Sequence, residues 1–410
     1  MDKVKHSSAL IIWILGALAT ITPFAIDLYL PAFSQIAADF GTTTATVSLS
    51  VSSYFVGMAV GQILYGPLLD RFGRRKPLYV GLTIFIITSM GCMLSKNVEV
   101  LVTFRFFQAL GGSVAWVAAV AMVRDFFPVQ ESVRVFSLLV LIIGVSPLLA
   151  PTLGGFIIVA LGWQMVFVAL SLIAAAILIT VYVYLPEGYQ PDPTVSLRTR
   201  PMLEVFGSIL RHPQFYTYTF AGAFAFSTLF IYVAGSPIIF MEVFHVSPQA
   251  YGGIFALLSV GFIGGSQFNI LLTKRFSSEK IFRVALLCLA ITSLVFLICV
   301  LNEWLGLYST IAMFFVCLSC VGLTNPNANA LALAPFTKNI GSASALLGCT
   351  QIGTAALVST GVGLFSANGI TPIVGLMALT SAIAFIILNA GRKIIKKEVS
   401  LAGIANTMTE

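Results

Sequence analysis

A single carboxylate stands in the middle of a long apolar stretch near the N-terminus. Asp27 is the only formally charged residue between Ser7 and Ala38, within the sequence ITPFAIDLYLPAF. An ionised side chain at the centre of a bilayer costs about 2.5 kcal/mol or more. A residue kept there has to be paired, hydrated or protonated, so Asp27 is a candidate site of proton chemistry.

A second isolated charge, Arg105, has the opposite sign. It is the only charged residue from Val100 to Val123. Asp27 and Arg105 lie about six and seven residues from the same end of their expected helices, or roughly 10 Å deep at ~1.5 Å per residue. We expect the two to be partners, directly or through water. The alternative is that Arg105 extends towards the lipid headgroups.

Such a carboxylate could exchange a proton. Apolar surroundings favour its neutral form, whereas a nearby guanidinium favours the charged form. Asp27 could therefore take a proton on one side of a membrane and release it on the other, with Arg105 as its partner in proton coupling. Pro31 supports this placement, because it cannot donate to the carbonyl group of residue 27 on the same helix. The alternative is a fixed Asp27–Arg105 pair that only joins two helices.

The rest of the chain is suited to lipid. Of its 410 residues, 58% are hydrophobic and 9% are charged, whereas soluble domains carry roughly 25% charged residues. The lipid bilayer is therefore an expected partner. The net charge of +7 does not indicate nucleic-acid binding, because membrane proteins collect cations on their cytoplasmic loops. The six cysteines lie in apolar segments, which is typical of small buried side chains.

The apolar segments predict an all-α membrane protein. A helix of about 20 apolar residues crosses a bilayer. Twelve segments qualify: 8–33, 46–69, 77–95, 98–123, 134–161, 163–185, 214–240, 248–273, 281–301, 305–335, 341–366 and 371–390. A polar linker, 186–213, divides the chain into an N-terminal six-helix bundle, 1–185, and a C-terminal six-helix bundle, 214–410.

The basic residues predict the orientation. With twelve spans and a cytoplasmic N-terminus, all of the 22 Lys and Arg residues except Lys96 and Arg105 fall on the cytoplasmic side. We therefore expect a multi-pass protein of a bacterial inner membrane with both termini in the cytoplasm. We also expect it to act as a monomer.

The two halves of the chain contain a similar segment at the corresponding position. DRFGRRK, from Asp70 to Lys76, follows the second predicted span, and KRFSSEK, from Lys274 to Lys280, follows the eighth. Both segments have Arg-Phe at the second and third positions and Lys at the seventh. Pseudo-symmetric halves are typical of transporters that bind a small-molecule substrate between the repeats, near mid-membrane.

The loop GPLLDRFGRRK has residue types suited to a cytoplasmic latch. Asp70 can accept hydrogen bonds from basic groups or from the start of a neighbouring helix, and Gly73 allows a tight turn. The alternative is a basic loop that only fixes topology. The loop resembles a signature of the major facilitator superfamily, which implies the major facilitator fold and a latch of Gly66, Asp70, Arg71, Gly73, Arg74 and Arg75.

Two further segments resemble patterns of this superfamily. Arg105 and Gln108 in LVTFRFFQALGG match its fourth-helix pattern. GVSPLLAPTLGG resembles the fifth-helix pattern of its antiporters, in which proline bends the helix and glycine permits close packing. The residues that would form this antiporter helix are Pro147, Pro151, Gly154 and Gly155. The alternative is the ordinary proline and glycine content of membrane helices.

The first span narrows the resemblance. AIDLYLPAF and MVRDFFP are similar to segments of the bicyclomycin and chloramphenicol resistance group of drug–proton antiporters. Some relatives carry a second acidic residue earlier on the first helix, where this chain has Ala19. The resemblance implies antibiotic resistance by multidrug efflux.

Amide and aromatic side chains are the candidates for substrate binding, because the second half has no charge deep in a span. Helix–helix adhesion is the alternative role for the amides. The candidates are Tyr29, Gln108, Phe224, Tyr232, Gln267, Asn325 and Asn329. Asp125, at the inner end of the fourth span, belongs either to a cytoplasmic gate or to a solvated face.

These features predict proton-coupled efflux of a drug-like or small metabolite substrate by alternating access. Proton-coupled uptake of a small nutrient is the alternative on the same fold. A membrane enzyme or receptor is a second alternative, although the sequence contains no nucleophile–base pair or metal-ligand cluster. We expect no enzyme activity, no metal and no cofactor. The proton gradient is the expected energy source, since the chain has no nucleotide-binding loop.

Overall fold

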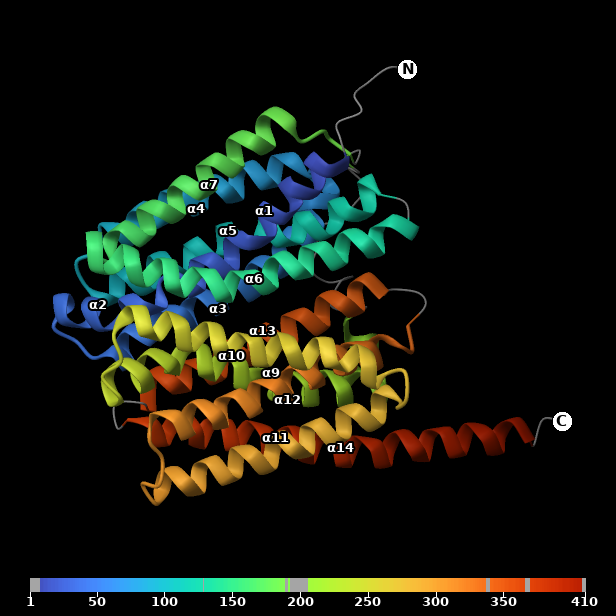
Figure 1. Cartoon of the computed structure of the whole chain (residues 1–410). Helices are drawn as coiled ribbons and strands as arrows, with labels where there is room; N and C mark the ends of the chain where they lie inside the picture. The colour runs from blue at the N-terminus through green and yellow to red at the C-terminus, as the bar shows by residue number, and fades with distance from the viewer. Residues whose placement is uncertain are drawn as a thin grey trace. The chain divides into compact units, whose positions relative to one another are not determined.

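A computed structural model describes residues 8–127, 129–188, 191, 206–336, 340–365 and 369–407. All regular elements in these ranges are helical (Figure 1). They are α1 (Ser8–Asp27), η1 (Leu30–Ala32), α2 (Phe33–Phe40), α3 (Thr44–Phe72), α4 (Arg75–Met93), α5 (Val98–Phe126), α6 (Val129–Leu161), α7 (Gln164–Tyr184), α9 (Pro213–Pro237), η2 (Ile238–Val243), α10 (Pro248–Leu272), α11 (Ser278–Leu301), α12 (Leu307–Leu333), α13 (Ile340–Phe365) and α14 (Ile370–Thr407).

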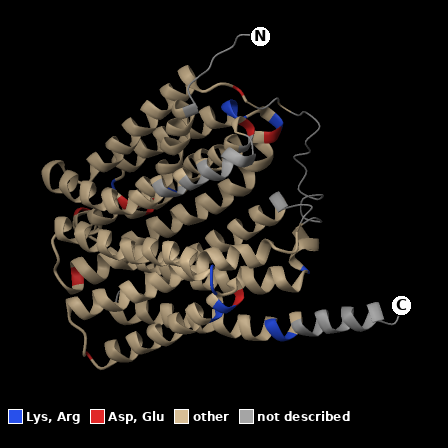
Figure 2. Cartoon of the chain, turned by 45° about the vertical axis from the view of Figure 1, so that its right-hand side comes forward, with Lys and Arg blue, Asp and Glu red and all other residues tan. Residues whose placement is uncertain are grey.

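Twelve helical segments of the described chain are long and apolar enough to cross a membrane. Figure 2 shows that Lys, Arg, Asp and Glu lie mainly at helix ends, while most of the helix length carries other residues. This arrangement leaves apolar side chains facing lipid and satisfies backbone hydrogen bonds within each helix. The predicted all-α fold with twelve spans is confirmed.

The first span differs from the single helix expected over 8–33. Helix α1 ends at Asp27, a short 3₁₀ turn covers Leu30–Ala32, and α2 begins at Phe33. Pro31 explains the break, because it has no N–H to donate to the carbonyl of Asp27 and it disfavours helical geometry at the residue before it. Asp27 therefore lies at a break in the helix.

Two other helix ends also differ from expectation. Helix α9 continues into the π-helix η2, and π-helical turns are rare and frequently occur at functional sites. Helix α14 runs for 38 residues, well beyond the predicted 371–390, and its last turns project past α11 and α12 (Figure 1).

Close contacts divide the chain into two compact units. The first consists of Met1–Leu197, Val233–Ser259 and Ser359–Gly369, and the second of Arg198–Tyr232, Val260–Val358 and Ile370–Glu410. Helices α9, α10 and α13 each contribute to both units. The division into halves 1–185 and 214–410 stays a prediction, and most of the linker 186–213 lies outside the described residues.

Small residues bring helices close together within each unit. In the first unit, a side chain at Gly57 would collide with the backbone of Phe106, and one at Gly81 would collide with Val114. In the second unit, the same holds for Gly265 against Ser319. Such close approach is typical of membrane helices, which associate by packing of small residues.

Candidate functional site

Arg105 is held in an aromatic cage inside the first unit. The side chain projects from α5 and is fully buried. Its guanidinium carbon lies 4.3 Å from the ring centre of Tyr54, 4.8 Å from that of Tyr29 and 6.0 Å from that of Phe167. The negative faces of these rings stabilise the buried cation. The alternative of an Arg105 that extends to the headgroups does not describe this structure.

The hydrogen bonds of Arg105 leave part of its guanidinium unused. Nη1 donates to the carbonyl oxygen of Ala25 at 3.0 Å and to Oε1 of Gln108 at 2.7 Å. Among the described residues, Nε and Nη2 have no hydrogen-bond partner, and no ion pair joins Arg105 to Asp27. A buried charged donor without a partner is costly. Nε and Nη2 of Arg105 could therefore donate hydrogen bonds to an anionic partner.

Asp27 is buried at the break that ends α1, with only 6% of its surface exposed. Arg105 contacts the backbone two residues earlier, at Ala25, so the two charges belong to one site although they are not paired. Tyr251 of α10 is also buried, and its hydroxyl lies 2.8 Å from the Ser236 hydroxyl. The Asp27 carboxylate is thus withdrawn from the surface at the point where α1 ends.

The glycines of α6 provide close contacts beside this site. A side chain at Gly154 would collide with the carbonyl group of Leu28, the residue after Asp27. A Cβ at Gly155 would lie 2.8 Å from the carbonyl oxygen of Pro248 at the start of α10. Pro147 and Pro151 lie within the same helix. The α6 glycines therefore allow the helix to touch the Asp27 break directly.

Two of the predicted substrate-binding residues belong to the Arg105 cage. Tyr29 is fully buried and its hydroxyl lies 2.8 Å from the Ser50 hydroxyl. Gln108 is equally buried, accepts from Arg105 and donates to the Ser89 hydroxyl at 2.6 Å. In this structure both side chains position Arg105.

The remaining substrate-binding candidates lie in the second unit. Gln351 donates to Asn329 at 2.8 Å and to Asn325 at 3.3 Å, so α12 and α13 share a cluster of amides. Gln267 is exposed on α10 and is not in this cluster. Tyr232 is buried against Phe314, with ring centres 5.4 Å apart, and Phe224 is half-buried. Their roles in substrate binding stay predictions.

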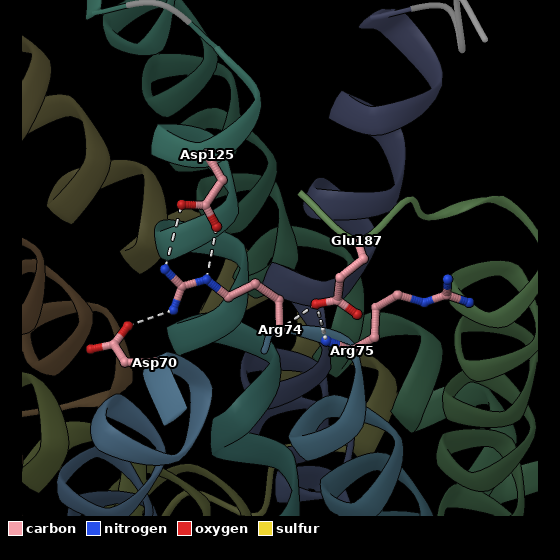
Figure 3. A network of polar contacts seen from close by, with 5 residues as sticks. All are labelled: Asp70, Arg74, Arg75, Asp125 and Glu187. Atoms are coloured by element: carbon pink, nitrogen blue, oxygen red, sulfur yellow. Dashed lines mark hydrogen bonds and ion pairs between the residues drawn. The ribbon is translucent and has the colours of Figure 1, made fainter. Parts of the chain in front are cut away.

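A network of charges surrounds Arg74 in the loop between α3 and α4 (Figure 3). Arg74 donates from Nε to Asp125 and from Nη1 to Asp70, both at 2.7 Å. Burial alone would lower the pKa of the Arg74 guanidinium, but the hydrogen bonds to Asp125 and Asp70 raise it, so Arg74 stays charged. The ends of α3 and α5 are thereby joined through one cation.

Glu187 completes this network from the chain segment that follows α7. Its Oε1 accepts from the backbone N–H of Arg74 at 2.8 Å and of Arg75 at 3.4 Å. These groups open α4, whose own N-cap residue makes no side-chain cap bond. Glu187 therefore caps α4, a role that the sequence had suggested for Asp70. The sequence did contain one indication of this role, because Glu187 is an acidic residue just after a span and on the same predicted side of the membrane as the basic loop.

The other latch residues have separate local roles. Gly73 has φ +83°, which favours glycine, and a Cβ there would lie 2.8 Å from Glu187 Oε1. Arg75 donates to the Tyr79 hydroxyl at 2.6 Å and to the Tyr182 carbonyl at 2.9 Å. Arg71 lies over the Phe72 ring. A side chain at Gly66 would meet no neighbour within 4 Å, so steric crowding does not require glycine there.

Asp125 and Asp70 should differ in their effect on stability. The Asp125 side chain is 12% exposed, whereas that of Asp70 is 48% exposed. Breaking a buried pair costs about 3 kcal/mol, and a solvent-screened pair contributes about 0.5 kcal/mol. We expect Asp125→Asn to lower the thermal midpoint of the purified protein clearly, and Asp70→Asn to lower it little while still impairing transport. Equal midpoints for the two variants would contradict this ranking.

Glu187 should act as the cap of α4 through its acceptor oxygen. Glu187→Ala removes that oxygen, whereas Glu187→Gln keeps a neutral acceptor. We expect the Arg74 and Arg75 amides to exchange hydrogen about tenfold faster in the alanine variant, as for a cap worth roughly 1.4 kcal/mol, and less so in the glutamine variant. Glu303→Ala, in another loop, is the control. Unchanged exchange in Glu187→Ala would show that the cap is dispensable.

The twelve apolar helices are those of a multi-pass membrane protein, and comparison with known proteins places the chain in a family. The pattern of the Major Facilitator Superfamily matches residues 15–359. The chain belongs to this superfamily, as its sequence motifs had led us to expect.

Named relatives align along most of the chain. An MFS-type transporter of uncharacterised function, YdgK of Bacillus subtilis, is 30% identical over 90% of this chain and 92% of its own length. A bicyclomycin resistance protein homolog of Haemophilus influenzae is 26% identical over 94% and 98%. The multidrug resistance protein MdtL of Escherichia coli O157:H7 is 28% identical over 93% and 96%. These names agree with the predicted drug-efflux group.

Solved structures support the fold. A POT family transporter crystallised with a thioalcohol-conjugated peptide has a TM-score of 0.74 at 13% identity, covering 95% of this chain and 96% of that one. A D-xylose–proton symporter has a TM-score of 0.69 at 17% identity, covering 91% and 97%. At such low identity these similarities concern the fold alone.

Proposed function

We propose that this protein exports a drug-like or small metabolite substrate in exchange for protons, by alternating access. The observation that carries the proposal is Asp27, a buried carboxylate at a helix break beside an incompletely hydrogen-bonded Arg105. The names of the relatives, bicyclomycin resistance protein homolog and multidrug resistance protein, support export of a drug-like compound.

The chemistry of the site suggests how a proton would be coupled to substrate. Among the described residues, no cation forms an ion pair with the buried Asp27 carboxylate, and burial without such a partner favours the protonated acid. In a second arrangement, the carboxylate would pair with Nε and Nη2 of Arg105, which have no hydrogen-bond partner among the described residues. That pairing favours the ionised form and releases the proton. The two arrangements would therefore differ in proton content, as coupling requires.

Several further properties belong to this proposal. The asymmetric distribution of Lys and Arg supports a bacterial inner-membrane protein with both termini in the cytoplasm and with the Arg74 network on the cytoplasmic side. The membership of a transporter family supports a transporter without enzyme activity. We propose that it works as a monomer, driven by the proton gradient, with no cofactor and with the lipid bilayer and a small molecule as its partners.

Expression in a bacterium that lacks its own efflux pumps tests export directly. The chain should lower the accumulation of bicyclomycin, chloramphenicol or another compound of a toxic panel, and an uncoupler that collapses the proton gradient should restore it. Accumulation that rises on expression and falls with the uncoupler would instead indicate proton-coupled uptake. No change across the panel, in cells that contain the protein in their membrane, would contradict drug export.

A further inference from the structure

Each unit contains an apolar groove at the same point of its repeat. In the first unit, a groove of about 280 Å³ lies between α3, α4 and α5 and is lined by Leu68, Phe72 and Val80, among others. In the second unit, a groove of about 340 Å³ lies between α10, α11 and α12. Each begins beside the loop that carries one copy of the repeated segment, DRFGRRK or KRFSSEK.

Part of the lining of the two grooves corresponds between the repeats. The second is lined by Leu272, Phe276 and Val284, which occupy the positions of Leu68, Phe72 and Val80 in the first repeat. The exposed fractions agree as well, with 44% for Phe72 and 43% for Phe276, and 59% for Val80 and 52% for Val284. The two repeats differ in most of their other residues. Their agreement here indicates a shared feature rather than a chance gap between helices.

A cation stands over the equivalent phenylalanine in each groove. The Arg71 guanidinium lies 5.7 Å from the ring centre of Phe72, and the Lys280 ammonium lies 4.8 Å from that of Phe276. Arg71 lies in the last turn of α3 and Lys280 in the first turn of α11, so each cation lies at the end of the groove nearest the repeated loop. Each groove therefore has an apolar wall and a positive charge over one of its lining phenylalanines.

The apolar walls and the nearby cation together indicate which kind of molecule each groove would bind. Apart from Phe276, which lies between two spans, the lining residues belong to candidate membrane spans, so the medium that reaches these walls is hydrocarbon. A positive charge at the end of an apolar groove, at the level of helix ends, complements an anionic headgroup. We propose that each groove binds the acyl chain of one anionic phospholipid, with the phosphate held by Arg71 in the first unit and by Lys280 in the second.

Native mass spectrometry of the detergent-purified protein tests this proposal. Phosphatidylglycerol and phosphatidylcholine with identical acyl chains are added together at equal concentration. We expect two phosphatidylglycerol molecules to be retained, preferred over phosphatidylcholine about fivefold, as for one charge contact worth roughly 1 kcal/mol. Equal retention of the two lipids would overturn the assignment of an anionic headgroup. This readout is independent of transport, so it does not depend on the proposed function.

Single substitutions in and near the two grooves test where the lipids bind. Val80→Trp and Val284→Trp each place a large ring in one groove at an exposed position, so each should reduce the retained phosphatidylglycerol from two molecules to one. Lys280→Gln should abolish the lipid preference at one site only, and Lys96→Gln, which removes an exposed cation beyond the opposite end of α4 from the DRFGRRK loop, should change nothing. Two tightly retained molecules in folded Val284→Trp protein, or full preference in Lys280→Gln, would exclude the second groove as a site.

Discussion

The variant Asp27→Asn is expected to reach the membrane at the wild-type level and yet fail to export substrate against a gradient. Asparagine keeps the size of the side chain but cannot take up or release a proton, so it resembles a permanently protonated carboxyl group. If Asp27 couples protons to transport, uphill export should fall to background. Exchange of labelled for unlabelled substrate, which needs no net proton movement, should survive.

A measurement of thermal stability distinguishes a loss of proton coupling in Asp27→Asn from misfolding. Because no ion pair joins Asp27 to Arg105 in the described structure, the substitution breaks no salt bridge. We therefore expect a thermal midpoint no lower than that of the wild type. Asp27→Glu keeps a carboxyl group and should retain part of the uphill export, and Glu99→Gln, at an exposed position that opens α5, should behave as wild type. A large loss of stability in Asp27→Asn would indicate a fixed structural pair.

Gly154→Leu should have the second large effect, on both stability and transport. Even a Cβ at this position would collide with the Leu28 carbonyl, and backbone atoms cannot move aside as a flexible side chain can. Forcing extra atoms into a packed contact costs about 1–3 kcal/mol. The leucine side chain should push α6 away from the helix break at Asp27, and this displacement should also abolish efflux.

The control for Gly154→Leu is Gly253→Leu, also in a membrane helix. Gly253 is exposed on α10 and a Cβ there meets nothing within 4 Å. Efflux and the amount of folded protein should stay normal in this control. Normal efflux in Gly154→Leu would mean that α6 can move away from Leu28 without consequence, and the resemblance to an antiporter helix would then be superficial.

Local patterns in the sequence were enough to predict the helices and the isolated charges. Apolar length identified twelve spans, and Asp27 and Arg105 stood out because a charge in an apolar run is rare. Pro31 was recognised as leaving the backbone carbonyl group of Asp27 without its helical hydrogen bond. That it would end α1 was not predicted, because proline can also kink a membrane helix that continues.

The partners of these side chains were harder to predict, because they depend on rotamers and on contacts far apart in the sequence. Arg105 was expected to meet Asp27, but it donates to Gln108 one turn away and to the Ala25 carbonyl. Glu187 reaches Arg74 across 113 positions of the chain. Gln351 joins Asn325 and Asn329 from a different helix. Nothing in the residue spacing distinguishes these contacts from other polar contacts of equal quality.

Substrate-dependent proton movement in reconstituted vesicles tests the central claim most directly. Vesicles that contain the purified protein and an entrapped pH-sensitive dye receive the compound to which the chain gives the greatest resistance. Wild-type protein should move protons in the direction opposite to the substrate, and should accumulate substrate uphill when a pH gradient is imposed. Asp27→Asn should show neither. Uphill accumulation by Asp27→Asn at the wild-type rate would contradict the account of Asp27 as the proton-coupling carboxylate.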